Sequence, residues 1–211
     1  MAKSVTFIDT EVGVDDHKIH DIGAIRQDRA SFHAANIREF AAFVEGTEYI
    51  CGHNILHHDL KYLQNALGYE LPAIKIDTLY LSPLLFPKRP YHALLKDDKL
   101  QSDQLNDPVN DCKKAATLFY DEVNAFFELP SKVKQIFCCL LYDHPEFHGF
   151  FRYVNFRPYQ VNVPELIRAE YEGQICSNAE LLPLIRHYPV ELAYALALVG
   201  AKDEHSITPP W

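Results

Sequence analysis

The stretch Ser4-Val5-Thr6-Phe7-Ile8-Asp9-Thr10-Glu11 is the part of the sequence that decides the fold. It begins as an apolar, β-branched run, which is typical of a buried strand, and it ends on two acidic residues. Side chains two residues apart in a strand point to the same side, so Asp9 and Glu11 share one face. Because most acidic residues are solvated surface groups, this pair indicates a site only in combination with acids from other segments.

The segments after this strand alternate between strand and helix patterns. We expect further strands at 18–26, 30–36, 49–51 and 74–81, and helices at 37–44, 59–67, 92–100 and 108–129. Asn36 and Asp107 stand where helix N-caps belong, and Pro108 stands at a first helical position. The order predicts an α/β fold with a mixed five-stranded sheet flanked by helices.

From Pro130 onward the pattern changes to short helical pieces, at 131–142, 164–172, 178–185 and 189–199. The sequence therefore predicts two domains, one over 1–129 and a helix-rich extension over 130–211. The Thr-Pro-Pro-Trp end is typical of a linker, so we expect it to lead into a further domain. Within the extension, Phe147 to Tyr159 interleaves aromatic residues with arginines, which is typical either of stacking on single-stranded bases or of an aromatic core.

Composition restricts the classes of partner. The 211 residues carry a formal net charge of −9, which argues against a broad basic face that coats nucleic acid, although a short 3′ end can be held in a small groove. The sequence has no apolar run of the roughly 18 residues that a membrane span requires, so we expect a soluble, cytoplasmic protein without a membrane partner. The five cysteines match no common zinc spacing and are expected to be reduced thiols.

Two further acids stand at the starts of predicted helices. Asp59 comes after the strand that ends at Gly52, and Asp111 lies one turn inside the helix that begins near Pro108. Asp59 is alternatively a helix N-cap, and Asp111 a solvated surface acid. Two-metal phosphodiester hydrolysis requires carboxylates from distant segments to hold hard cations roughly 4 Å apart. The combination of four acids favours such a site over the simpler interpretations.

These segments resemble the motifs of the DnaQ-like (DEDD) superfamily of 3′→5′ exonucleases. Phe7–Glu11 resembles the first motif, and Gly52–Leu63 resembles the second, with a spacing closer to the proofreading domains of family B polymerases. Asn110–Ala115 resembles the third motif, and Ile76–Leu79 with Pro90–Leu94 resembles the segment between the second and the third. The resemblance covers roughly residues 4–128.

The resemblance implies a ribonuclease H-like fold whose ligands Asp9, Glu11, Asp59 and Asp111 bind two Mg²⁺ or Mn²⁺ ions. It implies removal of nucleotides from the 3′ end of DNA, preferably single-stranded, with RNA as a possible substrate, and a role in DNA repair. The residues expected near the substrate are Thr10, Asn54 and His58, although Asn54 is alternatively a cap of the strand end. Modules of this kind also occur ahead of RecQ-like helicase domains, which makes a helicase in the same polypeptide the expected partner.

The sequence departs from the family at the general base. Members carry a His five residues, or a Tyr four residues, before the third-motif acid, and those positions here hold Asn106 and Asp107. One explanation is slow hydrolysis without a base, and another is substitution by His92, with His57 and His58 as further candidates. The third is a catalytically weak or silent module that binds nucleic-acid ends or a partner protein.

Overall fold

The computed structural model describes residues 3–92, 94 and 107–201. Contacts within the chain divide it into two compact units. We call the described parts of Met1–Leu79 and Ala93–Asp121 the sheet unit, and those of Tyr80–His92 and Glu122–Trp211 the helical unit. Most of the helix expected over 92–100 falls outside the described residues, as does Asn106.

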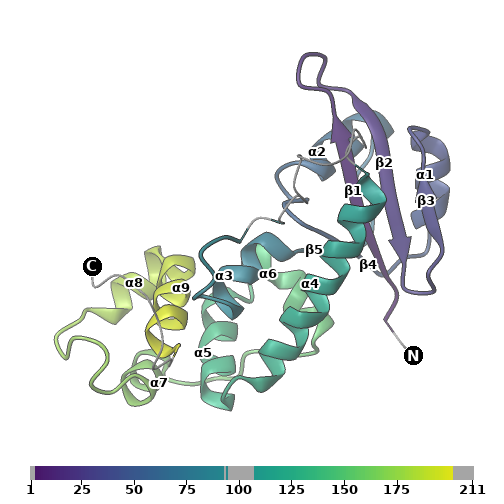
Figure 1. Cartoon of the computed structure of the whole chain (residues 1–211). Coiled ribbons are helices and arrows are strands. Elements are labelled where there is room, and N and C mark those ends of the chain that lie inside the picture. The colour runs from purple at the N-terminus through teal and green to yellow at the C-terminus, as the bar shows by residue number, and fades with distance from the viewer. Residues whose placement is uncertain (1–2, 93, 95–106, 202–211) are drawn as a thin grey trace. The chain divides into compact units, whose positions relative to one another are not determined.

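The described sheet unit contains a five-stranded mixed sheet of order β3-β2-β1-β4-β5, so the predicted α/β class and sheet are confirmed (Figure 1). Strand β1 pairs antiparallel with β2, which pairs antiparallel with β3, whereas β1 and β4, and β4 and β5, are parallel. The strands are β1 (Val5–Val12), β2 (Ile19–Arg26), β3 (Ser31–His33), β4 (Tyr49–Gly52) and β5 (Ile74–Asp77). The carboxyl ends of the three parallel strands therefore meet at one edge, which is where open α/β sheets bind ligands.

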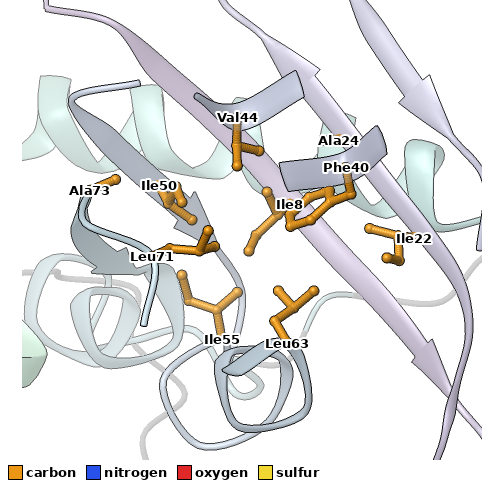
Figure 2. Close-up of a cluster of buried hydrophobic side chains, with 10 residues drawn as sticks. All are labelled: Ile8, Ile22, Ala24, Phe40, Val44, Ile50, Ile55, Leu63, Leu71 and Ala73. Carbon is orange, nitrogen blue, oxygen red and sulfur yellow. The ribbon is translucent and has the colours of Figure 1, made fainter. Parts of the chain in front are cut away.

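Helices α1 (Ile37–Val44) and α2 (Asp59–Leu67) cover one face of this sheet. Figure 2 shows the side chain of Ile8 from β1 among Phe40 and Val44 of α1 and Leu63 of α2, all of them buried. The predicted N-cap of α1 is confirmed, because the Asn36 side chain accepts hydrogen bonds from the backbone N–H groups of Arg38 and Glu39.

The first part of α4 (Pro108–Glu128) packs on the opposite face. The ring of Phe7 lies 5.8 Å from that of Phe119 and 5.9 Å from that of Tyr120, between ring centroids. Since Phe7 and Ile8 are neighbours in β1, alternation along the strand explains why one contacts α4 and the other the cluster under α1 and α2.

The prediction of a strand over 74–81 is wrong in its second half. Strand β5 ends at Asp77, and α3 (Thr78–Leu85) begins at the next residue. The Asp77 carboxylate accepts a hydrogen bond from the backbone N–H of Leu79 at 3.0 Å, as an N-capping residue does. The apolar run of residues 79–81 therefore belongs to a helix that also reaches into the helical unit.

The described helical unit also contains α5 (Ser131–Leu141), α6 (Pro145–Tyr153), α7 (Val163–Glu170), α8 (Leu181–His187) and α9 (Pro189–Gly200). The side chains of Phe147, Phe150 and Phe151 are fully buried, and Phe126 makes edge-on contacts with Phe150 and Phe151. The aromatic stretch is thus an aromatic core over α6, and a base-stacking role is excluded for these three rings. No helix of the described chain combines the length and the apolar character that a bilayer crossing needs.

Candidate metal centre

Three carboxylates from two distant segments converge in the sheet unit. Asp9 and Glu11 of β1 and Asp111 of α4 each offer an oxygen within 4.8 Å of the other two, and all three side chains are partly buried. We call these residues the acidic triad. Carboxylate oxygens in this arrangement are the ligands that Mg²⁺ and Mn²⁺ prefer in proteins.

The alternation of β1 places the two acids of the strand. Phe7, Asp9 and Glu11 lie at every second position, and Phe7 contacts Phe119 of α4. Asp111 precedes Phe119 by eight residues, a little over two helical turns, so both point to the same side of α4. The strand and the helix thus bring their acids together at the carboxyl end of β1.

A glycine permits this close approach of helix and strand. Gly23 of β2 lies directly across the ladder from Asp9, and a β-carbon on it would overlap the backbone of Pro108 and Val109. The Asp107 carboxylate caps the same turn by accepting a hydrogen bond from the Val109 N–H at 3.0 Å, as predicted. The first turn of α4 is therefore held against β2 beside the strand that carries Asp9.

Asp59 is buried beside the triad and is bonded to β1. Its Oδ1 accepts two hydrogen bonds of 2.7 Å, from the backbone N–H and from the Oγ1 hydroxyl of Thr10. Only 2% of Asp59 is exposed, and it is not a member of the triad. Thr10 thereby anchors the start of α2 to the strand between Asp9 and Glu11, and its expected contact with a nucleotide stays a prediction.

The charges of all four acids act on common neighbours. Interaction with the Asp59 carboxylate, 3.6 Å away, raises the pKa of His58, and the charges of Asp9 and Glu11 act in the same direction. Burial raises the pKa of the Cys112 thiol well above its usual value, and the charges of Asp9, Asp59 and Asp111 add to the effect. Lys114 offsets part of this charge, since its Nζ lies 3.4 Å from Asp111 Oδ1.

Asp77 holds the loop that precedes α2. Its carboxylate accepts hydrogen bonds from the backbone N–H groups of Asn54 at 2.7 Å and Leu56 at 3.0 Å, besides that of Leu79. Burial raises the pKa of Asp77 despite these three hydrogen bonds. Asn54 adopts a positive φ of 63°, a conformation that asparagine tolerates better than most residues. These observations concern the backbone of Asn54, so contact of its side chain with substrate stays a prediction.

The role of Asp77 was not predicted from the sequence. The sequence shows an acid after Ile74-Lys75-Ile76, and this position equally fits a strand end. Its three hydrogen-bond donors come from residues up to 23 positions away, which the sequence pattern does not show.

The candidate bases lie in different parts of the chain. His92 belongs to the helical unit, where its Nδ1 forms a 2.9 Å hydrogen bond with Ser82 Oγ. Burial lowers the pKa of His92, and the charge of Arg89 adds to the effect. His57 is exposed, and His58 contacts Asp59. A role as proton acceptor stays a prediction for each of these histidines.

Comparison of the chain with protein-family models, with curated proteins and with solved structures finds no match. The function of the chain is therefore inferred from the geometry of the acids and from the motifs in the sequence.

Proposed function

We propose that the chain is a metal-dependent 3′→5′ exonuclease with a ribonuclease H-like fold. The observation that carries the proposal is the convergence of Asp9, Glu11 and Asp111 to within 4.8 Å, beside the buried Asp59. The same four residues are those that the DnaQ-like resemblance selects. Carboxylate oxygens that converge at the carboxyl ends of parallel strands, where open α/β sheets bind ligands, favour a metal site.

The triad suits one Mg²⁺ or Mn²⁺ ion, and Asp9 together with Asp59 suits a second. Two such ions, when bound, would neutralise charge on the phosphodiester and acidify a water molecule. The two hydrogen bonds from Thr10 fix the orientation of Asp59, so one ligand of this second pair is held in place by the fold. Preorganised ligands of this kind lower the free-energy cost of binding the ion.

The proposed substrate is the 3′ end of DNA, with single strands preferred and RNA as a second possibility. This choice rests on the family resemblance, as do a role in DNA repair and a helicase domain in the same polypeptide.

The second candidate function is a weak or silent module that binds nucleic-acid ends or a protein partner. The observation that favours it is the pair Asn106 and Asp107, which stand where the family carries its His or Tyr base. An asparagine side chain has no basic nitrogen near neutral pH, so proton transfer would depend on another group or on solvent.

The test is incubation of the chain with 5′-labelled single-stranded DNA and Mn²⁺, with products resolved over time. The expected result is a ladder that shortens from the 3′ end and is absent with chelator. The isosteric variant Asp9→Asn/Glu11→Gln should abolish the ladder, and Asp15→Asn, an exposed acid on the adjoining hairpin, should retain it. Absence of any ladder on DNA and RNA with either metal would favour the silent module.

A further inference from the structure

A hollow of about 630 Å³ lies in the sheet unit beside α2. This volume is within the range of sites that hold small ligands, roughly 300–1,000 Å³. It lies between the end of the β1–β2 hairpin, the start of α1 and the exposed side of α2, and its polar lining residues are His17, Lys18, Lys61, Tyr62 and Asn65.

The lining is cationic in a chain of net negative charge. Lys18 and Lys61 line the hollow, and none of its described lining residues is acidic, although Asp16, outside the lining, interacts electrostatically with Lys18. Some other described lysines are held in ion pairs, such as Lys75 with Glu70 and Lys132 with Glu170. By contrast, the described contact of the Lys61 ammonium group is with the ring of Tyr62, 5.9 Å from its centroid. The two lysines therefore suit an external anion.

An unbroken series of side chains leads from the hollow to the acids. The ring of Tyr62 lies edge-on to that of His58, with centroids 5.4 Å apart, and His58 Nδ1 lies 3.6 Å from Asp59 Oδ2. Asp59 in turn accepts two hydrogen bonds from Thr10, which lies between Asp9 and Glu11 in β1. A polymeric ligand whose end lies at the acidic triad could therefore also reach this cationic, aromatic hollow.

We propose that this hollow binds a nucleotide of a single-stranded polynucleotide, upstream of the 3′ end that lies at the triad. Lys18 and Lys61 contact backbone phosphates, and the ring of Tyr62 and the amide of Asn65 lie against the base. Stacking on an aromatic ring tolerates any base, and lysines recognise phosphate without reading sequence, so the hollow favours strands without sequence preference. This inference rests on the proposed function, because 3′→5′ cleavage is what places the 3′ end of the strand at the triad and the upstream nucleotide in the hollow.

The division of charge has a physical reason. Four carboxylates repel a polyanion until metal ions bind, so affinity for the strand requires cations away from the cleavage site. The hollow supplies them at a position where they do not neutralise the metal ligands. A chain of net charge −9 would in this way hold a nucleic-acid end.

The experiment is fluorescence anisotropy of the full chain with a 5′-fluorescein oligothymidylate of eight nucleotides, in chelator so that hydrolysis does not interfere. The variant Lys18→Glu/Lys61→Glu should raise the Kd at least tenfold at 50 mM salt. It should also reduce the slope of log affinity against log salt by about 1.4, since single strands contribute roughly 0.7 per phosphate contact. The control Arg38→Glu/Arg186→Glu makes the same change of net charge at exposed residues outside the hollow, and should change the Kd less than twofold.

Equal weakening by both double variants would overturn the inference, because net charge alone would then govern binding. Absence of measurable binding by the wild-type chain would also overturn it. The hydrolysis assay is separate, since binding that depends on Lys18 and Lys61 without any Mn²⁺-dependent ladder would reject the exonuclease and retain a strand-binding hollow. A ladder whose KM is the same for the wild type and Lys18→Glu/Lys61→Glu would retain the exonuclease and reject the hollow.

Discussion

Gly23 lies directly opposite Asp9 in the β1–β2 ladder, and the space that its missing side chain leaves is filled by the backbone of Pro108 and Val109. The third acid of the triad, Asp111, is on the same helical turn. A glycine in the middle of a strand weakens the strand, because it adds backbone entropy and has no side chain to pack. Here that cost is offset by the seating of α4, which brings Asp111 to Asp9.

We expect Gly23→Ala to lower the free energy of unfolding by roughly 1–3 kcal/mol, the usual cost of overpacking a tight site. The added methyl group meets backbone rather than a flexible side chain, so the first turn of α4 must move. Asp111 moves with it, and Mn²⁺ should bind at least tenfold more weakly. Urea unfolding and isothermal titration calorimetry measure the two effects.

Gly46→Ala is the matched control for this substitution. Gly46 has a positive φ of 76° and nothing within 4 Å of an added β-carbon, so alanine introduces backbone strain without a packing clash. We expect a loss of about 1 kcal/mol in stability and an unchanged Mn²⁺ affinity. Wild-type Mn²⁺ affinity in Gly23→Ala would show that the close approach does not position Asp111.

The hydroxyl of Thr10 is a second positioning group. Thr10→Val keeps the shape of the side chain and removes the Oγ1 donor, which leaves Asp59 Oδ1 with the backbone N–H of the same residue. Loss of a hydrogen bond to a buried charged group should cost about 1–3 kcal/mol of stability. Mn²⁺ affinity and cleavage rate should fall together, and Thr10→Ser should restore both.

Thr6→Val is the control on the same strand. Thr6 is also buried, and its hydroxyl shares a 2.8 Å hydrogen bond with that of Thr47. This variant should lose stability but keep its Mn²⁺ affinity and cleavage rate. The idea that Thr10 acts through Asp59 fails if both variants lose activity in proportion to their stability.

The sequence predicted the elements around the triad better than the contacts between them. The strand through Ile8 and the capped starts of α1 and α4 are local patterns, and each is confirmed. The hydrogen bonds between Thr10 and Asp59 join residues 49 positions apart, and no local pattern indicates them. The seating of α4 on Gly23 is equally non-local, because it depends on which strand lies opposite the helix.

The buried carboxyl group of Asp77 should make the stability of the fold depend on pH. Its pKa is raised by burial, so the folded state holds the Asp77 proton more tightly than the unfolded state does. Its contribution to stability is therefore greatest at pH values below the ordinary value of 3.8, and it is lost as the pH rises through the folded pKa. Asp77→Asn removes this titration, so the stability of the wild type minus that of the variant should decrease with rising pH in acid solution.

At neutral pH Asp77→Asn should also loosen the loop before α2. The substitution replaces one carboxylate oxygen by an N–H₂ group, which cannot accept a hydrogen bond. At least one of the three backbone N–H groups of Asn54, Leu56 and Leu79 therefore loses its acceptor. Amide hydrogen exchange should quicken at these three positions. Asp21→Asn, a partly buried acid on β2, should leave their exchange rates unchanged.

His58 should couple the binding of protons to the binding of a metal ion. Interaction with Asp59 raises its pKa, so its contribution to stability is complete below the ordinary value of 6.5 and is lost as the pH rises through the folded pKa. Without metal, the wild type should thus gain stability over His58→Gln on acidification. A divalent cation beside Asp59 and Asp9 repels the protonated ring, so Mn²⁺ affinity should fall in the same pH range.

Calorimetric titration of Mn²⁺ in two buffers of different ionisation enthalpy measures the protons released on binding. The wild type should release a larger fraction of a proton than His58→Gln at neutral pH. His57→Gln, at the adjacent exposed histidine, should release as much as the wild type. Equal proton release by the wild type and both variants would mean that the bound ion does not change the protonation of His58. The ion would then lie away from Asp59.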